Sequence, residues 1–506
     1  MVKTIQISKI FNKIFYTIDF VIISAIISFI LFRIRTGDDY LNIANFLTVN
    51  HMLKKEQLLG ELPTSKEAYH NFFRFAWPSA LEALLVAMIG VVDTIMVGTL
   101  GKGSITAVGI TNQPKFVLLA AIFSLNTGII AVAARRKGQK DRIGANQTIR
   151  TGIILSAILS LLMAVLGYLF AKPILLLMGA ESSYLQDAVT FFRILMFSIP
   201  FQALNLTINA AQRGCGKTMI SLTTNVTSNI INIILDFLLI NGVGIFPRLE
   251  VKGAAIATTT GAFVAFCISL LTLFRKEDYL TFHIKAGWAI KKHVINPIMR
   301  VSTSAFVEQV FMRIGFLVYA AIVARLGETA YATHIICMNI LSLSFCFGDG
   351  LSIASSALVG QNMGAKRPDL SIMYGKTGQR IAFIISTIVF FVFIFGRFFL
   401  ISLFTNEQMI IIIGAHIMII CALTTHLQTS QVVLNGCLRG AGDTGYVAAI
   451  SLISVAFVRP LLTWALCFPL GFGLYGAWIA LLVDQTFRFI TSYRRFSGGK
   501  WSSITL

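Results

Sequence analysis

The chain alternates between long apolar stretches and short polar ones, a pattern that predicts a series of membrane-spanning helices. Most of the apolar stretches reach the length of about 20 residues that an α-helix needs to cross a bilayer. From residue 74 onward the pattern predicts twelve spans, at 75–98, 115–135, 149–170, 188–210, 219–242, 253–274, 299–325, 335–358, 378–403, 410–437, 447–470 and 474–493. The expected fold class is therefore an all-α integral membrane protein.

The twelve predicted spans divide into two halves whose sequences repeat. Residues 74–101 align without a gap with residues 300–327, an offset of 226 positions that places Glu82 on Glu308. The same offset places residues 209–218 on residues 435–444. Because each half has an even number of spans, both halves have the same orientation and are related by an axis along the membrane normal. The repeat thus predicts two six-helix lobes.

The repeat also sets the domain boundaries that we expect: an N-lobe at 74–274, a basic linker at 275–298, a C-lobe at 299–498 and a tail at 499–506. Residues 1–73 precede the repeat. Within them, an apolar segment at about 15–32 predicts an extra hydrophobic helix, either spanning the membrane or lying in its surface plane. Residues 37–67 are polar enough to lie in water, and Thr64 to Glu67 has the pattern of a helix start.

The first repeated span carries two acids, Glu82 and Asp93, eleven positions apart and therefore on one helix face. Acids inside a span are costly and usually mark the path of an ion or a substrate. Glu82 and Glu308 lie near the ends of their spans, so capping by loop groups stays open as an alternative role. Pro78 interrupts the helix ladder and supplies a hinge.

Amide side chains form stripes at helical spacing inside other spans. The stripes contain Asn225, Asn229, Asn232 and Asp236; Gln202, Asn205 and Asn209; and Gln428, Gln431 and Asn435. Each amide alone is more typical of hydrogen bonding between membrane helices. Matched stripes in both halves, together with the acids, favour a water-filled substrate cavity between the lobes. We expect this cavity to be lined by Glu82, Glu308, Gln202, Asn205, Asn209, Asn229, Gln428, Gln431 and Asn435.

Charged residues elsewhere in the spans have a simpler interpretation. Asp484 and Arg488 are one helical turn apart and are expected to pair. Arg313 and Arg459 are expected to be fixed positive partners for acids of the second half.

The net charge of +20 comes from Lys and Arg in short loops between spans. That placement indicates contact with anionic lipid head groups rather than with nucleic acid. Basic residues gather in alternate loops, which therefore face the cytoplasm. The sequence has no GxxxxGK[ST] pattern, no HExxH pattern and no Cys/His cluster at metal spacing, so we do not expect an enzyme.

Three sets of segments are specific when they are taken together. The first span has Pro78 fifteen positions before Asp93 and ends in VDTIMVGTLG. The turns RGCG at 213–216 and RGAG at 439–442 repeat each other, and NIILDFLLINGVG is followed by VKGAAIATT. In these features residues 74–498 resemble the multidrug and toxic compound extrusion (MATE) family.

The resemblance implies an antiporter whose two lobes open alternately inward and outward, exporting cationic amphipathic compounds as H⁺ or Na⁺ flows in. The family's coupling site maps onto Asp93, Asn232, Asp236 and Thr258, with Asp93 and Asp236 as the expected ligands if the ion is Na⁺. Glu308 matches an acid often used in the C-lobe. A second C-lobe acid of some members falls on Gln428 here, which shifts the expected coupling site to the N-lobe.

We expect a monomer in the bacterial cytoplasmic membrane, with no cofactor besides the coupling ion. Two other functions stay open at this point. A flippase for a lipid-linked precursor would need a strongly basic cavity to hold phosphates, whereas the predicted cavity is acidic and rich in amides. An integral-membrane enzyme or a channel is disfavoured by the missing catalytic cluster and by the repeat.

Overall fold

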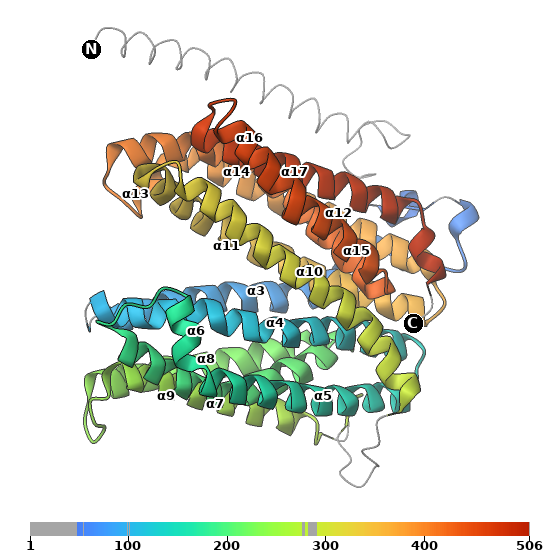
Figure 1. Cartoon of the computed structure of the whole chain (residues 1–506). Coiled ribbons are helices and arrows are strands. Elements are labelled where there is room, and N and C mark those ends of the chain that lie inside the picture. The colour runs from blue at the N-terminus through green and yellow to red at the C-terminus, as the bar shows by residue number, and fades with distance from the viewer. Residues whose placement is uncertain are drawn as a thin grey trace.

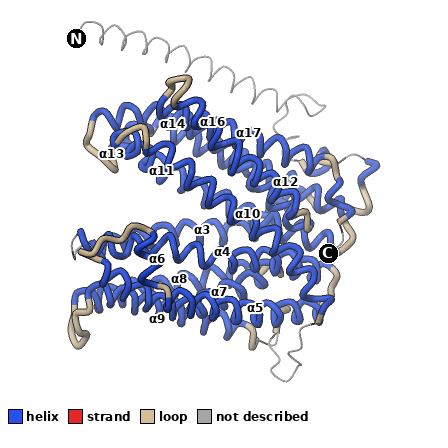
Figure 2. Tube along the Cα trace, in the orientation of Figure 1, coloured by secondary structure: helices blue, strands red, loops and turns tan. Residues whose placement is uncertain are grey.

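The computed structural model describes residues 48–504, apart from residues 54, 99, 101, 276–278 and 282–290. The described residues are mostly helical, and none of them forms a strand (Figure 2). The extra hydrophobic helix predicted at about 15–32 lies outside the described residues, as does part of the predicted linker.

The helices form two lobes in chain order, with the first lobe blue to green and the second yellow to red (Figure 1). The N-lobe contains α3 (Ser65–Gly98), α4 (Lys102–Gly138), α5 (Arg142–Leu169), α6 (Ala171–Leu177), α7 (Leu185–Gly214), α8 (Thr218–Asn241) and α9 (Glu250–Thr272). The C-lobe contains α10 (Lys292–Ala324), α11 (Glu328–Gly364), α12 (Pro368–Phe395), α13 (Arg397–Ser402), α14 (Gln408–Ala441), α15 (Thr444–Ser451), the π-helical η3 (Leu452–Val458), α16 (Arg459–Cys467) and α17 (Gly473–Ser497). Short turns, η1 (Val49–His51), η2 (Lys55–Gln57) and η4 (Lys500–Ser503), lie outside the lobes.

Eleven of the described helical segments are long and apolar enough to cross a membrane. The remaining predicted span, 474–493, is helical within α17 but less apolar, because it carries Asp484 and Arg488. The chain is therefore a multi-pass membrane protein built from two lobes.

Several predicted boundaries are wrong. The second predicted span starts at residue 115, whereas α4 begins at Lys102, because the helix continues through polar residues that an apolar pattern does not mark. The predicted span 447–470 contains the π-helical η3 between α15 and α16. The predicted helix start is confirmed: α3 begins at Ser65, and Thr64 and Glu67 bond each other's backbone N–H groups at 3.3 and 3.0 Å in a capping box.

The two lobes touch where α4 connects to α5 and α11 connects to α12, an end we call the basic end because both connections carry Lys and Arg. A Cβ atom on Gly138 would lie 1.7 Å from the carbonyl oxygen of Gln361. A Cβ atom on Gly364 would lie 2.0 Å from that of Arg135. The two contacts between α4 and α11 are made by residues that the repeat relates to each other. Only glycine permits such close approach of backbones. Together they form a glycine seam that closes the lobes at the basic end.

Residues 48–63, which we call the strap, run along the C-lobe before the chain enters α3. The ammonium of Lys376 donates to the carbonyl of Met52 at 2.6 Å, and Arg380 donates to that of Thr48 at 3.1 Å. Arg367 donates to the carbonyl of Glu61 at 3.0 Å. Because α3 belongs to the N-lobe, whereas Lys376 and Arg380 lie on α12 and Arg367 directly precedes it, the strap ties one lobe to the other.

Apolar side chains anchor the strap. Val49 is fully buried, Met52 is 1% exposed, and both pack in a cluster with Phe72 of α3 and Met373 of α12. The prediction that residues 37–67 lie in water stays a prediction, and the structure adds that two apolar side chains of this segment pack against the helices. Val49 and Met52 are apolar residues among polar ones, so they produce no hydropathy signal. Both contribute to docking because they pack against apolar side chains of α12.

We expect Met52→Asp to undock the strap, because the substitution would bury an unpaired carboxylate and remove a buried side chain that contributes about 1.5–3 kcal/mol. The measurement is hydrogen–deuterium exchange of the amides in residues 48–63, which should become about tenfold to a hundredfold faster. Leu59→Asp is the matched control, since Leu59 is 61% exposed and its exchange should not change. Equal protection in Met52→Asp and wild type would contradict the docking role of Met52.

Candidate ion and substrate site

Asp93 on α3 and Asp236 on α8 form an acidic pair inside the N-lobe. Their carboxyl groups interact directly, and Asp236 also interacts with Asn232, one turn earlier on α8. Asp236 is 2% exposed and Asp93 is half-buried. The Oδ1 atoms of both acids lack a hydrogen-bond partner within the described structure. Two carboxylates so close repel each other, so the pair favours a proton or a cation held between them.

The other two predicted coupling residues are Asn232, on α8, and Thr258, on the adjacent helix α9. The Nδ2 atom of buried Asn232 has no hydrogen-bond partner in the described part of the chain. Helix α9 packs on Asn232 through Gly261, whose Cβ atom would lie 3.2 Å from the Asn232 Cβ. Thr258 lies one turn before Gly261 and donates its hydroxyl hydrogen to the carbonyl of Ala254 at 2.9 Å. Its hydroxyl oxygen therefore has lone pairs left to accept a bond or bind a cation.

Lys115 on α4 is a charged neighbour of this pair that the sequence did not identify. Its half-buried ammonium acts electrostatically on Asp93. The sequence pattern took Lys115 as the start of a span, but α4 begins thirteen residues earlier, at Lys102, so Lys115 lies in the helix interior. When Lys115, Asp93 and Asp236 are all ionised, the three side chains together have a net charge of −1.

Among the described residues, no three or more His, Cys, Asp or Glu side chains come together as a metal site would require. A sodium ion between Asp93 and Asp236 would therefore take its remaining ligands from amide, hydroxyl, carbonyl or water oxygens. Such oxygen ligands suit a hard cation.

Glu82 occupies a second site, near the middle of α3, and makes its contacts apart from Asp93. Its Oε1 accepts hydrogen bonds from Asn225 at 2.5 Å and from Ser221 at 2.9 Å, and Arg213 lies 3.7 Å away. Glu82 is 7% exposed. Glu82 and Asp93 both face α8, as expected for acids on one face of α3, but they contact different turns of it. That they look into one shared space stays a prediction.

The amides of the predicted N-lobe stripe extend this site as a chain of hydrogen bonds. Asn209 donates to Asn205 at 2.9 Å, and Asn205 donates to Asn225 at 3.1 Å. Asn229 is half-buried on the same helix as Asn225. These bonds join α7 and α8, which is the interhelical role that single amides in membrane spans usually have.

Glu308 repeats the Glu82 arrangement in the C-lobe. Arg439 donates to its Oε1 at 2.7 Å and Ser451 does so at 3.1 Å. Arg439 is the repeat mate of Arg213, and Ser451 is the repeat mate of Asn225. In both lobes, then, a buried glutamate of the first helix binds the arginine of the RG-x-G turn and a polar residue of the fifth helix.

The remaining predicted cavity residues lie on α7 and α14. Gln202 and Gln428 are repeat mates, and the Oε1 atom of each has no hydrogen-bond partner in the described structure. Gln428 and Gln431 are each 3% exposed, and Asn435 accepts a bond from Ser492 at 2.9 Å. Pro78 lies inside α3, which is assigned as one continuous helix.

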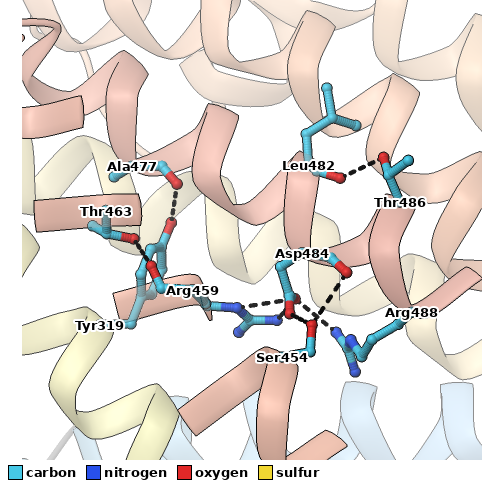
Figure 3. Close-up of polar contacts among 9 residues, drawn as sticks. All are labelled: Tyr319, Ser454, Arg459, Thr463, Ala477, Leu482, Asp484, Thr486 and Arg488. Atoms are coloured by element: carbon cyan, nitrogen blue, oxygen red, sulfur yellow. Dashed lines mark hydrogen bonds and ion pairs between the residues drawn. The ribbon is translucent and has the colours of Figure 1, made fainter. Parts of the chain in front are cut away.

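The C-lobe has no acidic pair at the place that corresponds to Asp93. The repeat mate of Asp93 is Tyr319, which is buried and donates to the carbonyl of Ala477 at 3.1 Å (Figure 3). Beside it, Arg459 lies 5.7 Å from the centre of the Tyr319 ring and bonds Asp484.

Asp484 is the centre of a closed ionic cluster in the C-lobe core. It bonds Arg459, Arg488 and Ser454, and the predicted pair with Arg488 is confirmed at 3.0 Å (Figure 3). Asp484 and Arg459 are fully buried, and with Arg488 the three ionised side chains have a net charge of +1. Arg313, by contrast, lies 5.6 Å from the centre of the Phe116 ring on α4.

A family model called MatE matches the chain twice, at residues 78–238 and at residues 304–465. The two matches fall one in each lobe and together cover more than half of the chain. They agree with the internal repeat at an offset of 226 positions.

Proteins with similar sequences are named as transporters. "Uncharacterized transporter YisQ" of Bacillus subtilis (strain 168) is 25% identical over 437 residues, which cover 85% of this chain and 94% of that protein. "Probable multidrug resistance protein NorM" of Thermotoga maritima is 27% identical over 443 residues, covering 86% of this chain and 93% of that protein.

Solved structures with similar folds are MATE transporters. A structure titled "Crystal structure of MATE in the bent conformation" has a TM-score of 0.80 at 20% identity and covers 86% of this chain and 97% of its own. An outward-facing multidrug resistance MATE transporter has a TM-score of 0.79 at 20% identity and covers 85% of this chain and 96% of its own. At this identity the likeness concerns the fold.

Proposed function

Because this chain belongs to the MatE family of membrane transporters, we propose that it is a secondary active antiporter that exports cationic amphipathic compounds in exchange for H⁺ or Na⁺. The multidrug names of similar proteins support this substrate class. Their bacterial sources support a location in the bacterial cytoplasmic membrane. A single chain supplies both lobes, so a monomer is sufficient.

The acidic pair Asp93 and Asp236 is the observation that carries the proposal. The two carboxyl groups interact inside the N-lobe, and Lys115 can balance only one of their two charges, so a further bound positive charge relieves their repulsion. A proton or a sodium ion can supply that charge. Release of the ion restores the repulsion and changes how α3 and α8 pack, which couples ion binding to lobe movement.

The closed basic end supports alternating access. With the glycine seam made, a compound can reach the space between the lobes only from the opposite end. Inward opening then requires that the seam and the strap contacts break. Ion binding at Asp93 and Asp236 acts on α3, the helix that follows the strap, and so biases the same movement.

The test uses the purified full-length protein in proteoliposomes loaded with ethidium, under an imposed proton gradient or an imposed sodium gradient, each alone. We expect one of the two gradients to drive ethidium transport by the wild type. Asp93→Asn should lose that dependence, because the remaining acid no longer has a partner to share an ion with. Ethidium movement that ignores both gradients, or full ion dependence in Asp93→Asn, would contradict the proposal; the first result would favour a flippase or a channel.

A further inference from the structure

Asp349 is the one acid in the interior of the described spanning helices whose side chain is exposed. Glu82, Asp236, Glu308 and Asp484 are buried, and Asp93 is half-buried. Asp349 lies near the middle of α11, well inside the spanning helix. An exposed carboxylate at this position needs water or a ligand of opposite charge.

The position of Asp349 on α11 places it beside a contact between the lobes. The next residue, Gly350, packs on α3 of the N-lobe so tightly that its Cβ atom would lie 2.5 Å from the backbone nitrogen of Ala80. Ser342 lies seven positions before Asp349, on the same helix face, and is also exposed. Asp349 is therefore next to a point where the lobes touch, on the face of α11 that also carries Ser342.

The charge of Asp349 is not neutralised by the protein. It makes no hydrogen bond and no ion pair with any residue that the structure describes. The charged group that acts on it is Arg439, which is already bonded to Glu308 at 2.7 Å. The acids Glu82 and Asp484 likewise have arginine partners of their own. An unpaired carboxylate at this depth is costly and favours a ligand of opposite charge.

An unsatisfied neighbour supports the same site. Gly348, the residue before Asp349, packs against Thr429 of α14. A Cβ atom on Gly348 would lie 3.9 Å from the Thr429 Cα. Gln428, which precedes Thr429 on α14, is 3% exposed. Its Oε1 atom has no hydrogen-bond partner within the described residues. An oxygen acceptor that lacks a donor thus lies on α14, the helix that packs against Gly348, next to Asp349 in sequence.

We propose that Asp349 binds the positively charged group of the exported compound, a monovalent lipophilic organic cation, on the C-lobe side of the space between the lobes. This assignment rests on the proposed antiport and gives each lobe its own task. Asp93 and Asp236 of the N-lobe bind the coupling ion, and Asp349 of the C-lobe binds the substrate. Because the contact of Gly350 with Ala80 must break when the lobes move apart at this end, the surroundings of Asp349 change during transport.

The test measures equilibrium binding of tetraphenylphosphonium to the full-length protein in nanodiscs, without any gradient. Asp349→Asn should weaken binding about tenfold, while Asp349→Glu should stay within about twofold of wild type, because it keeps the charge. Glu328→Gln is the matched control, an exposed acid at the start of the same helix, and should bind like wild type. Unfolding temperature shows whether each variant is folded.

The outcomes separate this assignment from the proposed function. Equal affinity in folded Asp349→Asn and wild type would overturn the role of Asp349 and leave the antiport intact. An altered H⁺ or Na⁺ dependence with unchanged affinity for tetraphenylphosphonium would also overturn it, by assigning Asp349 to the coupling ion. If the wild type binds no tetraphenylphosphonium, the proposed substrate class and the Asp349 assignment both fail.

Discussion

Asp236→Asn is expected to reduce ion-driven efflux to the level of empty proteoliposomes while the protein stays folded and inserted. The amide has almost the same shape as the carboxyl group and still reaches Asn232. It has no charge, so the remaining carboxylate of Asp93 no longer needs an ion to relieve repulsion. The initial rate of ethidium efflux under the driving gradient is the measurement.

Asp187→Asn is the control for this variant, since Asp187 is an exposed acid in the first turn of α7, away from the acidic pair. Its efflux should equal that of the wild type. Binding of tetraphenylphosphonium should survive in Asp236→Asn, because Asp349 belongs to the other lobe. Normal gradient-driven efflux by folded Asp236→Asn would remove Asp236 from the coupling mechanism.

Asp484→Ala is expected to lower the free energy of unfolding by about 3–5 kcal/mol, the range measured when one partner of a buried ion pair is removed. Arg459 and Arg488 would keep their positive charges in the C-lobe core without an acid. Their side chains are 0% and 6% exposed, so water does not replace the lost carboxylate. Thermal unfolding in detergent, followed by tryptophan fluorescence, should show a much lower transition or no folded protein.

The control for Asp484→Ala is Glu250→Ala, which removes the acid of an ion pair with Arg248 at 3.4 Å. Those two side chains are 59% and 63% exposed, so the loss should be at most about 1 kcal/mol. If Asp484→Ala unfolds at the same temperature as Glu250→Ala, the cluster in Figure 3 contributes little to the stability of the C-lobe.

The internal repeat contained more information than the sequence analysis used. The offset that pairs Glu82 with Glu308 also pairs Arg213 with Arg439, and these residues turn out to be bonded to the glutamates. Sequence position alone did not show that the first helix and the RG-x-G turn of each lobe meet. Packing of six helices decides that contact, and a pattern along one helix carries no record of it.

Two other results depended on features that hydropathy does not detect. Lys115 and Pro114 interrupt the apolar run, so hydropathy predicts a span that starts at residue 115, although the helix continues through both. In the strap, Val49 and Met52 are apolar residues among polar ones, so hydropathy does not predict that they dock. In both cases the deciding contact is with another helix: α3 for Lys115, through Asp93, and α12 for the strap.

The glycine seam has a consequence for leakage. At Gly138 and Gly364 the lobes touch through backbone atoms, and backbone atoms have no rotamers to exchange. A seal made of side chains opens briefly whenever one of them changes rotamer, which side chains do on the nanosecond timescale. The seal here opens only when the helices α4 and α11 separate as whole bodies. For the antiport proposed above, this means that protons and sodium ions pass the seam only when the lobes move apart.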